Sequence, residues 1–230
     1  MNYAVILSGG VGSRFGSDIP KQYIEVEAKP IIQYTLEKFF SCSAIDEIVI
    51  VAADVWHDSI KKITDSLGTK PCHFAVAGKS RQGSIYNGLC KCMEFNITDE
   101  DNVVIHDAVR PLVCEKLISD CVRALEFADA VMPVLPVVDT IYVKSGNYVS
   151  KLLNRDELVA GQSPEAFKLK KYYELNKRLS DKELDAVRGS SELAHMFGLK
   201  IKIIDGQTDN FKITQASDLI KFASMLKENR

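Results

Sequence analysis

The chain has 230 residues, of which 46% are hydrophobic and 26% are charged, a balance typical of a globular protein with a substantial core. Its formal net charge of -2 at pH 7 excludes a protein that binds nucleic acid through a generally basic surface. The six cysteines include no paired C-x-x-C arrangement, so free thiols in a reducing compartment are the expected state.

The beginning of the chain contains a short apolar strand and a glycine-rich loop. Residues 3–7 form an apolar run with the length of one buried strand. The loop that follows reads Ser8-Gly9-Gly10-Val11-Gly12-Ser13-Arg14-Phe15-Gly16, and Pro20-Lys21 comes shortly after it. Glycines let the backbone approach a ligand closely, and its N–H groups together with Arg14 and Lys21 suit phosphate oxygens. The pattern predicts a nucleoside triphosphate site; a tight turn with solvated charges is the alternative.

Two better-known phosphate motifs do not fit this loop. The G-x-x-x-x-G-K-[ST] string of ATPases does not occur in the chain. The G-x-G-x-x-G fingerprint of dinucleotide-binding proteins would start at Gly10 and Gly12, but Phe15 takes the place of its third glycine. The acidic residue that those proteins place about 20 residues later, after a second strand, is also missing. A nicotinamide-dependent oxidoreductase is therefore disfavoured.

Strand-like and helix-like segments alternate along the first half of the chain. Apolar runs predict strands, and helical spacing or a helix start predicts the helices between them. The expected strands are 45–53, 72–77 and 103–105, and the expected helices are 30–40, 80–93 and 115–127. This alternation predicts a Rossmann-like α/β fold whose mostly parallel sheet has helices on both faces.

The pattern changes after residue 130. Residues 130–138 are strand-like, but two prolines there suit an edge strand or a bulge. Residues 139–153 read as a hairpin, which we expect to be an arm that packs on a second subunit of a homodimer; a hairpin lying on its own domain is the alternative. Later elements are helices at 168–179 and 184–196, a strand at 200–204, and a terminal helix with Thr214 as candidate N-cap and Asp218 in its first turn. We expect one domain over 1–230 with this arm.

The start of the chain runs directly into a strand, without a basic region or a small-residue cleavage site. No run of 18 or more apolar residues occurs, so no membrane span is predicted. We expect a cytoplasmic protein.

Polar residues follow several predicted strands, where open parallel sheets bind their ligands. Residues 78–84 form a second small-residue loop, in which we expect Ser80 to act as an N-cap. The fourth strand ends in His106-Asp107-Ala108-Val109-Arg110, and Asp209 and Lys212 follow the last strand. Asp107 and Asp209 are candidate ligands for Mg²⁺, although each alone is more often a capping or solvated residue.

Seven motifs in one order resemble a known family, and they span almost the whole chain. They are Ser8-Gly9-Gly10-x-Gly12-x-Arg14, Pro20-Lys21-Gln22-Tyr23, Arg81-x-x-Ser84, His106-Asp107-Ala108-x-Arg110-Pro111, Asp139-Thr140-Ile141, Gly161-Gln162-Ser163-Pro164 and Asn210-x-Lys212-Ile213-Thr214. They are similar to those of the cytidylyltransferases that act on methylerythritol phosphate and on ribitol phosphate.

The resemblance implies that CTP and a polyol phosphate react to a CDP-polyol and pyrophosphate, with Mg²⁺ as the divalent cation. Arg14, Lys21 and Lys212 would be the catalytic cations. The implied nucleotide-binding residues are Ser8, Gly9, Gly10, Gly12, Gly78, Arg81 and Ser84. The implied acceptor-binding residues are Asp107, Arg110, Thr140, Arg155 and Ser163, with Arg155 supplied by the partner's arm. Asp107 and Asp209 would hold the metal.

Three departures from the methylerythritol branch concern the acceptor. Gly9 replaces an alanine, Val109 gives the His-Asp-Ala-Val-Arg-Pro form associated with ribitol phosphate enzymes, and the segment at 188–191 replaces a Thr-Asp-Glu-Ala motif. These departures favour ribitol 5-phosphate, and hence a role in cell-wall or capsule polymers. The enzyme of isoprenoid synthesis that uses methylerythritol phosphate is the alternative, and a non-catalytic sugar-nucleotide sensor is disfavoured by the three cations.

Overall fold

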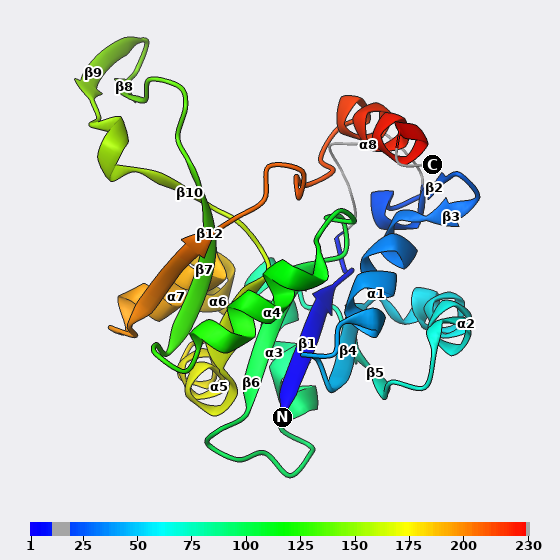
Figure 1. The fold of residues 1–230 in the computed structure, drawn as a ribbon. Helices are drawn as coiled ribbons and strands as arrows, with labels where there is room; N and C mark the ends of the chain where they lie inside the picture. Colours follow the sequence, from blue (N-terminus) through cyan, green and yellow to red (C-terminus); the bar gives the residue numbers. More distant parts are fainter. Residues whose placement is uncertain (11–18, 229–230) are drawn as a thin grey trace.

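A central eight-stranded sheet organises the protein in the computed structural model, which describes residues 1–10 and 19–228 (Figure 1). The strand order is β10-β7-β11-β6-β1-β4-β5, with β12 paired to β7. The parallel part consists of β1 (Asn2–Leu7), β4 (Glu47–Ala52), β5 (Cys72–Val76) and β6 (Asn102–Asp107). Leu7 is in register with Val51 and with Asp107, so the carboxyl ends of these strands meet at one edge. Gly12 and Arg14 lie outside the described residues.

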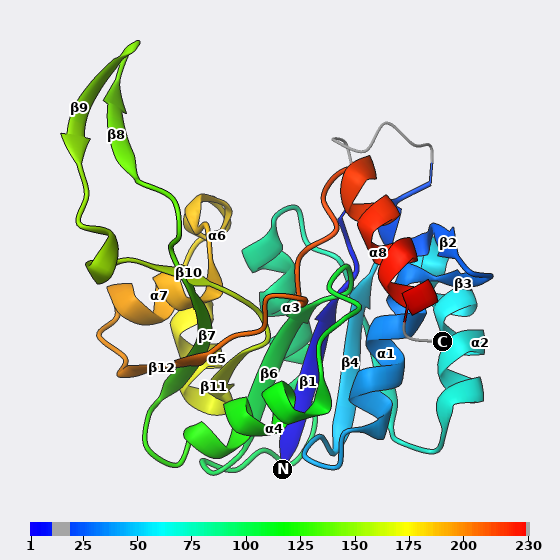
Figure 2. The ribbon, with the colours of Figure 1, turned by 45° about the horizontal axis from the view of Figure 1, so that its top comes forward.

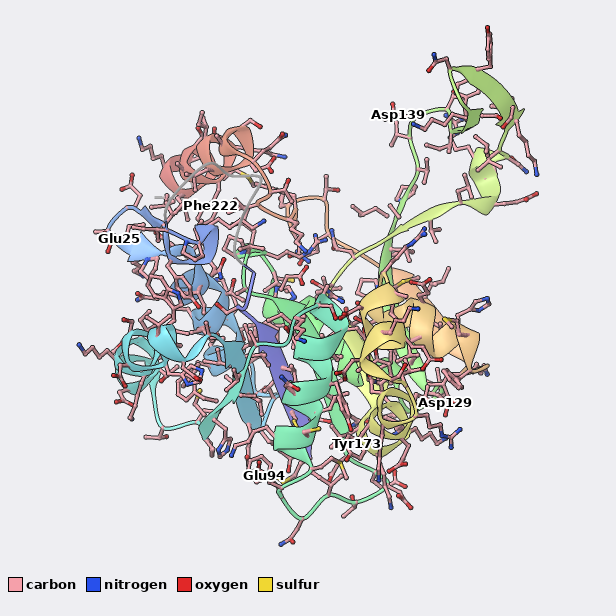
Figure 3. All side chains as sticks on the ribbon, turned by 180° about the vertical axis from the view of Figure 1, so that it is seen from behind. Glu25, Glu94, Asp129, Asp139, Tyr173 and Phe222 are labelled. Carbon is pink, nitrogen blue, oxygen red and sulfur yellow. The ribbon has the colours of Figure 1, made fainter. Side chains whose placement is uncertain are left out.

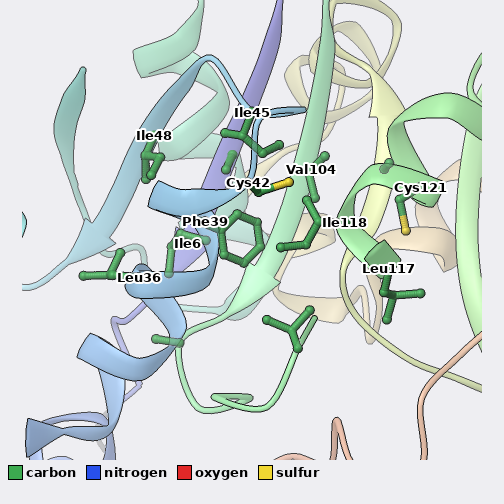
Figure 4. Packing of buried hydrophobic residues seen from close by; sticks show 14 of the residues in the cluster. Ile6, Leu36, Phe39, Cys42, Ile45, Ile48, Val104, Leu117, Ile118 and Cys121 are labelled. Atoms are coloured by element: carbon green, nitrogen blue, oxygen red, sulfur yellow. The ribbon is translucent and has the colours of Figure 1, made fainter. Parts of the chain in front are cut away.

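Helices cover both faces of this sheet, as the alternation predicts. The first face packs against α1 (Ile31–Ser41), α2 (His57–Leu67) and α4 (Glu115–Ala124), and the second against α3 (Arg81–Cys92), α5 (Leu169–Lys177) and α7 (Ser190–Met196). In β1, Ala4 and Ile6 belong to the first core cluster, while Tyr3 and Val5 belong to the second. Figure 4 shows Phe39 of α1 beside Ile118 of α4 in the first cluster. The predicted fold class is confirmed.

The second half of the sheet is built differently from the expectation. It consists of β7 (Ala130–Pro136), β10 (Val159–Gly161), β11 (Glu165–Lys168) and β12 (Ile201–Asp205). β7 is parallel to β12 on one side and antiparallel to β10 and β11 on the other. Of the two alternatives for 130–138, the edge strand is therefore wrong, whereas the register of β7 shifts by two residues between its pairing with β10 and its pairing with β11, as at a bulge. Proline lacks only the N–H donor, and the carbonyl of Pro133 still accepts a hydrogen bond from the N–H of Gln162 at 2.8 Å.

Several local predictions also need correction. The predicted helix at 184–196 is two helices, α6 (Asp181–Ala186) and α7, which begins after Gly189. The terminal helix α8 (Ala216–Glu228) begins two residues after Thr214, and the Asp218 carboxylate accepts hydrogen bonds from the N–H and hydroxyl of Thr214. The sequence analysis did not predict α2, β10, β11 or the short pair β2 (Glu25–Val26) and β3 (Lys29–Pro30). No helix among the described residues combines the length and the apolar character needed to cross a membrane.

The predicted hairpin is present as β8 (Tyr142–Ser145) and β9 (Tyr148–Leu152), joined at Gly146, whose φ of 58° favours glycine. It stands away from the sheet on two long connections (Figures 1 and 2). Every residue of both strands is exposed in the single chain, including Tyr148 at 81% and Val149 at 66%. Its packing on a second subunit stays a prediction.

Two loops close tightly over the end of β4. The N–H of Ser8 bonds to the carbonyl of Val51, and the N–H of Ala77 bonds to the carbonyl of Ala52. The loops after β1 and β5 are thereby drawn together from both sides of β4. A Cβ atom placed on Gly9 would lie far inside van der Waals contact with the Cβ of Ala77, so glycine is required there while Ala77 is present.

We expect Gly9→Ala to lower the free energy of unfolding by about 1–3 kcal/mol, the usual cost of overpacking a tight site. Adding Ala77→Gly should restore most of this loss, because it removes the atom that the new methyl group would meet. Gly10→Ala is the matched control, since no atom of residues 1–10 and 19–228 lies within 4 Å of a Cβ there. Urea unfolding measures all four proteins; equal stability of Gly9→Ala and Gly10→Ala would contradict the steric argument.

Candidate active site

A cavity of about 550 Å³ lies at the carboxyl ends of β1, β5 and β6. Four segments of the chain contribute to it: the loops after these three strands and the segment that follows β12. Its lining residues are Leu7, Gly9, Gly10, Lys21, Gln22, Gly78, Lys79, Ser80, Arg81, Ser84, Asp107, Val109, Lys212 and Thr214. The topology thus brings together eight residues that the sequence analysis singled out: Gly9, Gly10, Lys21, Gly78, Arg81, Ser84, Asp107 and Lys212.

Asp107 is the centre of a charged cluster at this edge. Its Oδ2 atom lies 3.0 Å from Lys212 Nζ and 3.5 Å from Arg110 Nε, and its Oδ1 atom lies 3.3 Å from Arg81 Nε. Burial alone would raise the pKa of Asp107, but the charges of Arg81, Lys212 and Arg110 outweigh it and hold that pKa well below its usual range. The carboxylate is therefore ionised, and it holds three cations from three parts of the chain at one point.

His106 fixes the backbone behind this cluster. Its ring is fully buried, and burial lowers its pKa to about 4, so it is neutral near pH 7. Nε2 lies 3.1 Å from the carbonyl of Arg110, which only accepts, so Nε2 carries the proton. Nδ1 then accepts from the hydroxyl of Ser163 at 3.2 Å. Ser163 is 4% exposed and supports His106 from behind the cavity.

The glycine loop is held in place by a residue to which the sequence analysis gave no role. The Nε2 atom of Gln22 donates to the carbonyls of Ser8 at 2.7 Å and of Gly10 at 2.9 Å. Gln22 belongs to the short helical turn Lys21–Tyr23, so the segment that carries Lys21 is also the one that shapes the loop. Tyr23 adds a hydrogen bond with Ser8 and stacks on Trp56. The sequence analysis quoted Gln22 within the motif 20–23, and its place next to Lys21 is the signal that could have indicated this role.

The second loop is compact because its glycine and serines bond to one another. Ser80 caps α3 by accepting from the N–H of Gly83, as expected. Ser84 Oγ accepts from the N–H of Gly78 and donates to the carbonyl of Ser80. A Cβ atom on Gly78 would lie 2.5 Å from the carbonyl carbon of Gly83, so a side chain does not fit there. The loop therefore offers backbone at close range to a ligand.

The segment that carries Lys212 is anchored by buried amides. The fully buried Asn210 donates from Nδ2 to the carbonyl of Ser163 at 2.7 Å and to Oε1 of Gln162 at 3.2 Å. Its own carbonyl accepts from Nη1 of Arg110 at 2.7 Å. The sequence analysis quoted Gln162 and Asn210 within motifs without giving them a function. They position Lys212 two residues further along the chain.

Six of the predicted site residues that the structure describes do not line the cavity: Ser8, Arg110, Ser163, Thr140, Arg155 and Asp209, of which the last three are exposed. Thr140 and Arg155 are exposed at the base of the hairpin, and Arg155 Nη1 donates to the carbonyl of Val138. Figure 3 shows Asp139 where the chain runs out to the hairpin, far from Phe222 of α8. Asp209 is exposed and does not line the cavity. Arg14 and Gly12 fall among the residues that the structure does not describe.

The donor set of the cavity suits a metal that arrives with phosphate. Within residues 1–10 and 19–228, no three His, Cys, Asp or Glu side chains gather to form a metal cage. Asp107 is the carboxylate among the lining residues of the described chain. Mg²⁺ typically takes one or two carboxylates and completes its shell with water and substrate phosphates. Asp107 fits that role, whereas the exposed Asp209 supplies no ligand to this cavity.

Known proteins resemble this chain over nearly its full length. Residues 2–228 match the model of the family described as 2-C-methyl-D-erythritol 4-phosphate cytidylyltransferase. A protein of Lactiplantibacillus plantarum named ribitol-5-phosphate cytidylyltransferase is 35% identical over 237 residues, with 100% of both chains covered. A Clostridium beijerinckii protein named 2-C-methyl-D-erythritol 4-phosphate cytidylyltransferase is 36% identical over 219 residues, with 94% of each chain covered.

The fold gives the same result. The solved structure of 4-diphosphocytidyl-2C-methyl-D-erythritol synthase from Anaerococcus prevotii superimposes with a TM-score of 0.82 at 26% identity, covering 98% of this chain and 96% of that one. The 2-C-methyl-D-erythritol 4-phosphate cytidylyltransferase of Francisella tularensis has a TM-score of 0.80 at 26% identity over 97% of this chain. With a family model and curated relatives above 30% identity that cover it almost completely, the chain belongs to this family of cytidylyltransferases.

Proposed function

We propose that this cytidylyltransferase transfers the cytidylyl group of CTP to ribitol 5-phosphate or a close polyol phosphate, releasing pyrophosphate. The observation that carries the proposal is the position of the three departures from the methylerythritol branch. Gly9 and Val109 line the cavity, and Ser190 Oγ of the third departure accepts a hydrogen bond from Arg81 Nη1 at 2.8 Å. The Lactiplantibacillus plantarum relative, matched over all of both chains, carries the ribitol-5-phosphate name.

In the proposed reaction, an oxygen of the acceptor phosphate forms a bond to the α-phosphorus of CTP. The bond from that phosphorus to the bridging oxygen breaks, and the electron pair leaves with pyrophosphate. Such transfers need positioning and charge stabilisation more than covalent help from the protein. Lys21 and Lys212 supply positive charge from two sides of the cavity, and the backbone of Gly9, Gly10 and Gly78 lies close enough to bind phosphate or base.

Asp107 keeps the cations in place for this reaction. By binding Lys212, Arg110 and Arg81 at once, it prevents three like charges from moving apart before the substrates arrive. Asp107 would be the residue that holds Mg²⁺, and the ion would supply positive charge that favours the approach of a negatively charged nucleophile.

The identity of the acceptor distinguishes the two branches of the family, and kinetics with both acceptors test it directly. We expect a higher kcat/KM for ribitol 5-phosphate than for 2-C-methyl-D-erythritol 4-phosphate, measured by pyrophosphate release with CTP. A tenfold preference corresponds to about 1.4 kcal/mol of transition-state binding, which one well-placed hydroxyl contact supplies. Activity should disappear in excess chelator. A clear preference for the methylerythritol substrate would assign the chain to isoprenoid synthesis, and full turnover with chelator would remove Mg²⁺ from the proposal.

The proposed catalytic cations make a second prediction. Arg14→Ala, Lys21→Ala and Lys212→Ala should each lower kcat by about a hundredfold or more, because each removes a charge that acts on the transferred or leaving phosphates. Lys62→Ala is the matched control, since Lys62 is exposed on α2. Steady-state kinetics at saturating CTP and acceptor measure the effect. If a variant keeps a nearly normal kcat, the residue substituted in it is not one of the catalytic cations.

We also propose that the hairpin forms a homodimer in which Arg155 serves the neighbouring active site. The exposed apolar side chains of β8 and β9 and the distance of Arg155 from its own cavity lining support this arrangement. Mixing Arg155→Ala with Lys212→Ala subunits in equal amounts should restore about a quarter of wild-type activity, since half of the dimers would hold one intact site. No recovery despite subunit exchange, verified by mass spectrometry, would place Arg155 in its own subunit's site.

A further inference from the structure

The Arg81 side chain is held by groups from three different strands and helices. Its Nε atom lies 3.3 Å from Asp107 Oδ1, its Nη1 atom donates to Ser190 Oγ at 2.8 Å, and its Nη2 atom lies 3.7 Å from Glu165 Oε2. A guanidinium is planar and carries five N–H donors in a fixed fork. Two hydrogen bonds and the longer ion pair to Glu165 therefore orient the plane of Arg81 at the wall of the cavity.

Glu165 is built into the sheet so that its two oxygens face different partners. It is 8% exposed and begins β11, in register with Ile105 of β6, two residues before Asp107. Its Oε1 atom accepts from the N–H of Ser191 at 3.0 Å and from the hydroxyl of Ser191 at 2.5 Å. Its Oε2 atom faces Arg81. A buried carboxylate with both oxygens engaged is a fixed charge, and it constrains whatever cation lies beside it.

A second route ties the beginning of α7 to the loop that carries Arg81. Gln82, the next residue, donates from Nε2 to the hydroxyl of Tyr172 at 3.0 Å. That hydroxyl donates to the carbonyl of Ser190 at 3.1 Å. Ser190 thus bonds to Arg81 through its side chain, and its carbonyl is linked to Gln82 through the hydroxyl of Tyr172. The start of α3 and the start of α7 are therefore connected by two routes at the cavity.

We propose that Glu165, together with Ser190, is a positioning residue for the transfer reaction: it orients the guanidinium of Arg81 against Asp107 and toward the substrate phosphates. The inference rests on the proposed function. It gives the segment 188–191, which departs from the methylerythritol branch, a physical route to the cavity: a change there moves Ser190 and Ser191, and through them Arg81. The charges agree with this arrangement, because Asp107 and Glu165 outweigh the effect of burial and raise the pKa of Arg81.

The test begins with Glu165→Gln, which keeps the size of the side chain and an oxygen for Ser191 but removes the charge facing Arg81. We expect kcat to fall about tenfold while KM for CTP changes less than about twofold. A guanidinium in the wrong orientation stabilises the charge that develops in the transition state less well, whereas it affects substrate binding less. Glu126→Gln makes the same chemical change at an exposed residue after α4 and should leave both constants unchanged.

A double-mutant cycle separates positioning from a general structural effect. In an Arg81→Lys background, which lacks the guanidinium fork, Glu165→Gln should cost less than about twofold in kcat, because its effect passes through Arg81. Ser190→Ala should lower kcat in the wild-type background by about threefold and add little to Arg81→Lys. Because Ser190→Ala removes a different contact of Arg81, this variant still tests the proposal if Glu165→Gln does not fold. Equal losses in both backgrounds, or an unchanged kcat, would overturn the inference.

The outcomes also separate this inference from the function on which it rests. A wild-type protein that releases no pyrophosphate from CTP with any polyol phosphate would overturn the proposed function and this inference together. An active wild-type protein whose Glu165→Gln and Ser190→Ala variants behave like Glu126→Gln would overturn the inference alone.

Discussion

The compensated charge of Asp107 is the interaction on which the rest of the site depends. A carboxylate this buried is stable only with partners, and three cations reach it from three parts of the chain: Arg81 from α3, Arg110 from the loop after β6, and Lys212 from the segment after β12. Removing Asp107 would leave three like charges around one cavity, and removing one cation would weaken the hold on the others. The cluster is thus the electrostatic centre of the cavity, and it also connects segments that are far apart in the sequence.

Backbone approach is the second constraint, and it explains why glycines recur in the two loops at the cavity. Gly9 leaves room for Ala77, and Gly78 lets its own backbone lie against that of Gly83. These contacts pull two loops over the end of β4, where Ser8 and Ala77 are hydrogen-bonded to it. A site that recognises a base and phosphates through backbone groups needs this closeness, since a single extra methyl group would separate the loops.

Much of this arrangement follows from local sequence patterns, and the rest depends on contacts between residues far apart in the chain. The alternation of apolar runs and helical spacing predicted the sheet with its two helical layers, and the turn around Gly146 predicted the hairpin. The position of β7 was left open because prolines in a strand indicate either an edge or a bulge, and the register of β7 does shift between β10 and β11. The role of Gln22 was missed because nothing in a lone glutamine says which carbonyls it will bind. Likewise, the partners of Asp107 lie 26 and 105 residues away at Arg81 and Lys212, and local pattern carries no information on such pairs.

The same geometry connects two of the departures from the methylerythritol branch, Val109 and the segment 188–191, to the charged cluster. The segment of Lys212 is attached to the loop after β6 through the N–H of Ile213 and the carbonyl of Val109. The side chain of Val109 is also buried in a core cluster that contains Ile213, so a change at Val109 acts on the segment that carries Lys212. Asp107 holds Arg81, Arg110 and Lys212, and Ser190 of the segment 188–191 adds a hydrogen bond to Arg81. A change at Ser190 or at Val109 therefore acts on a cation of the charged cluster or on the segment that carries one.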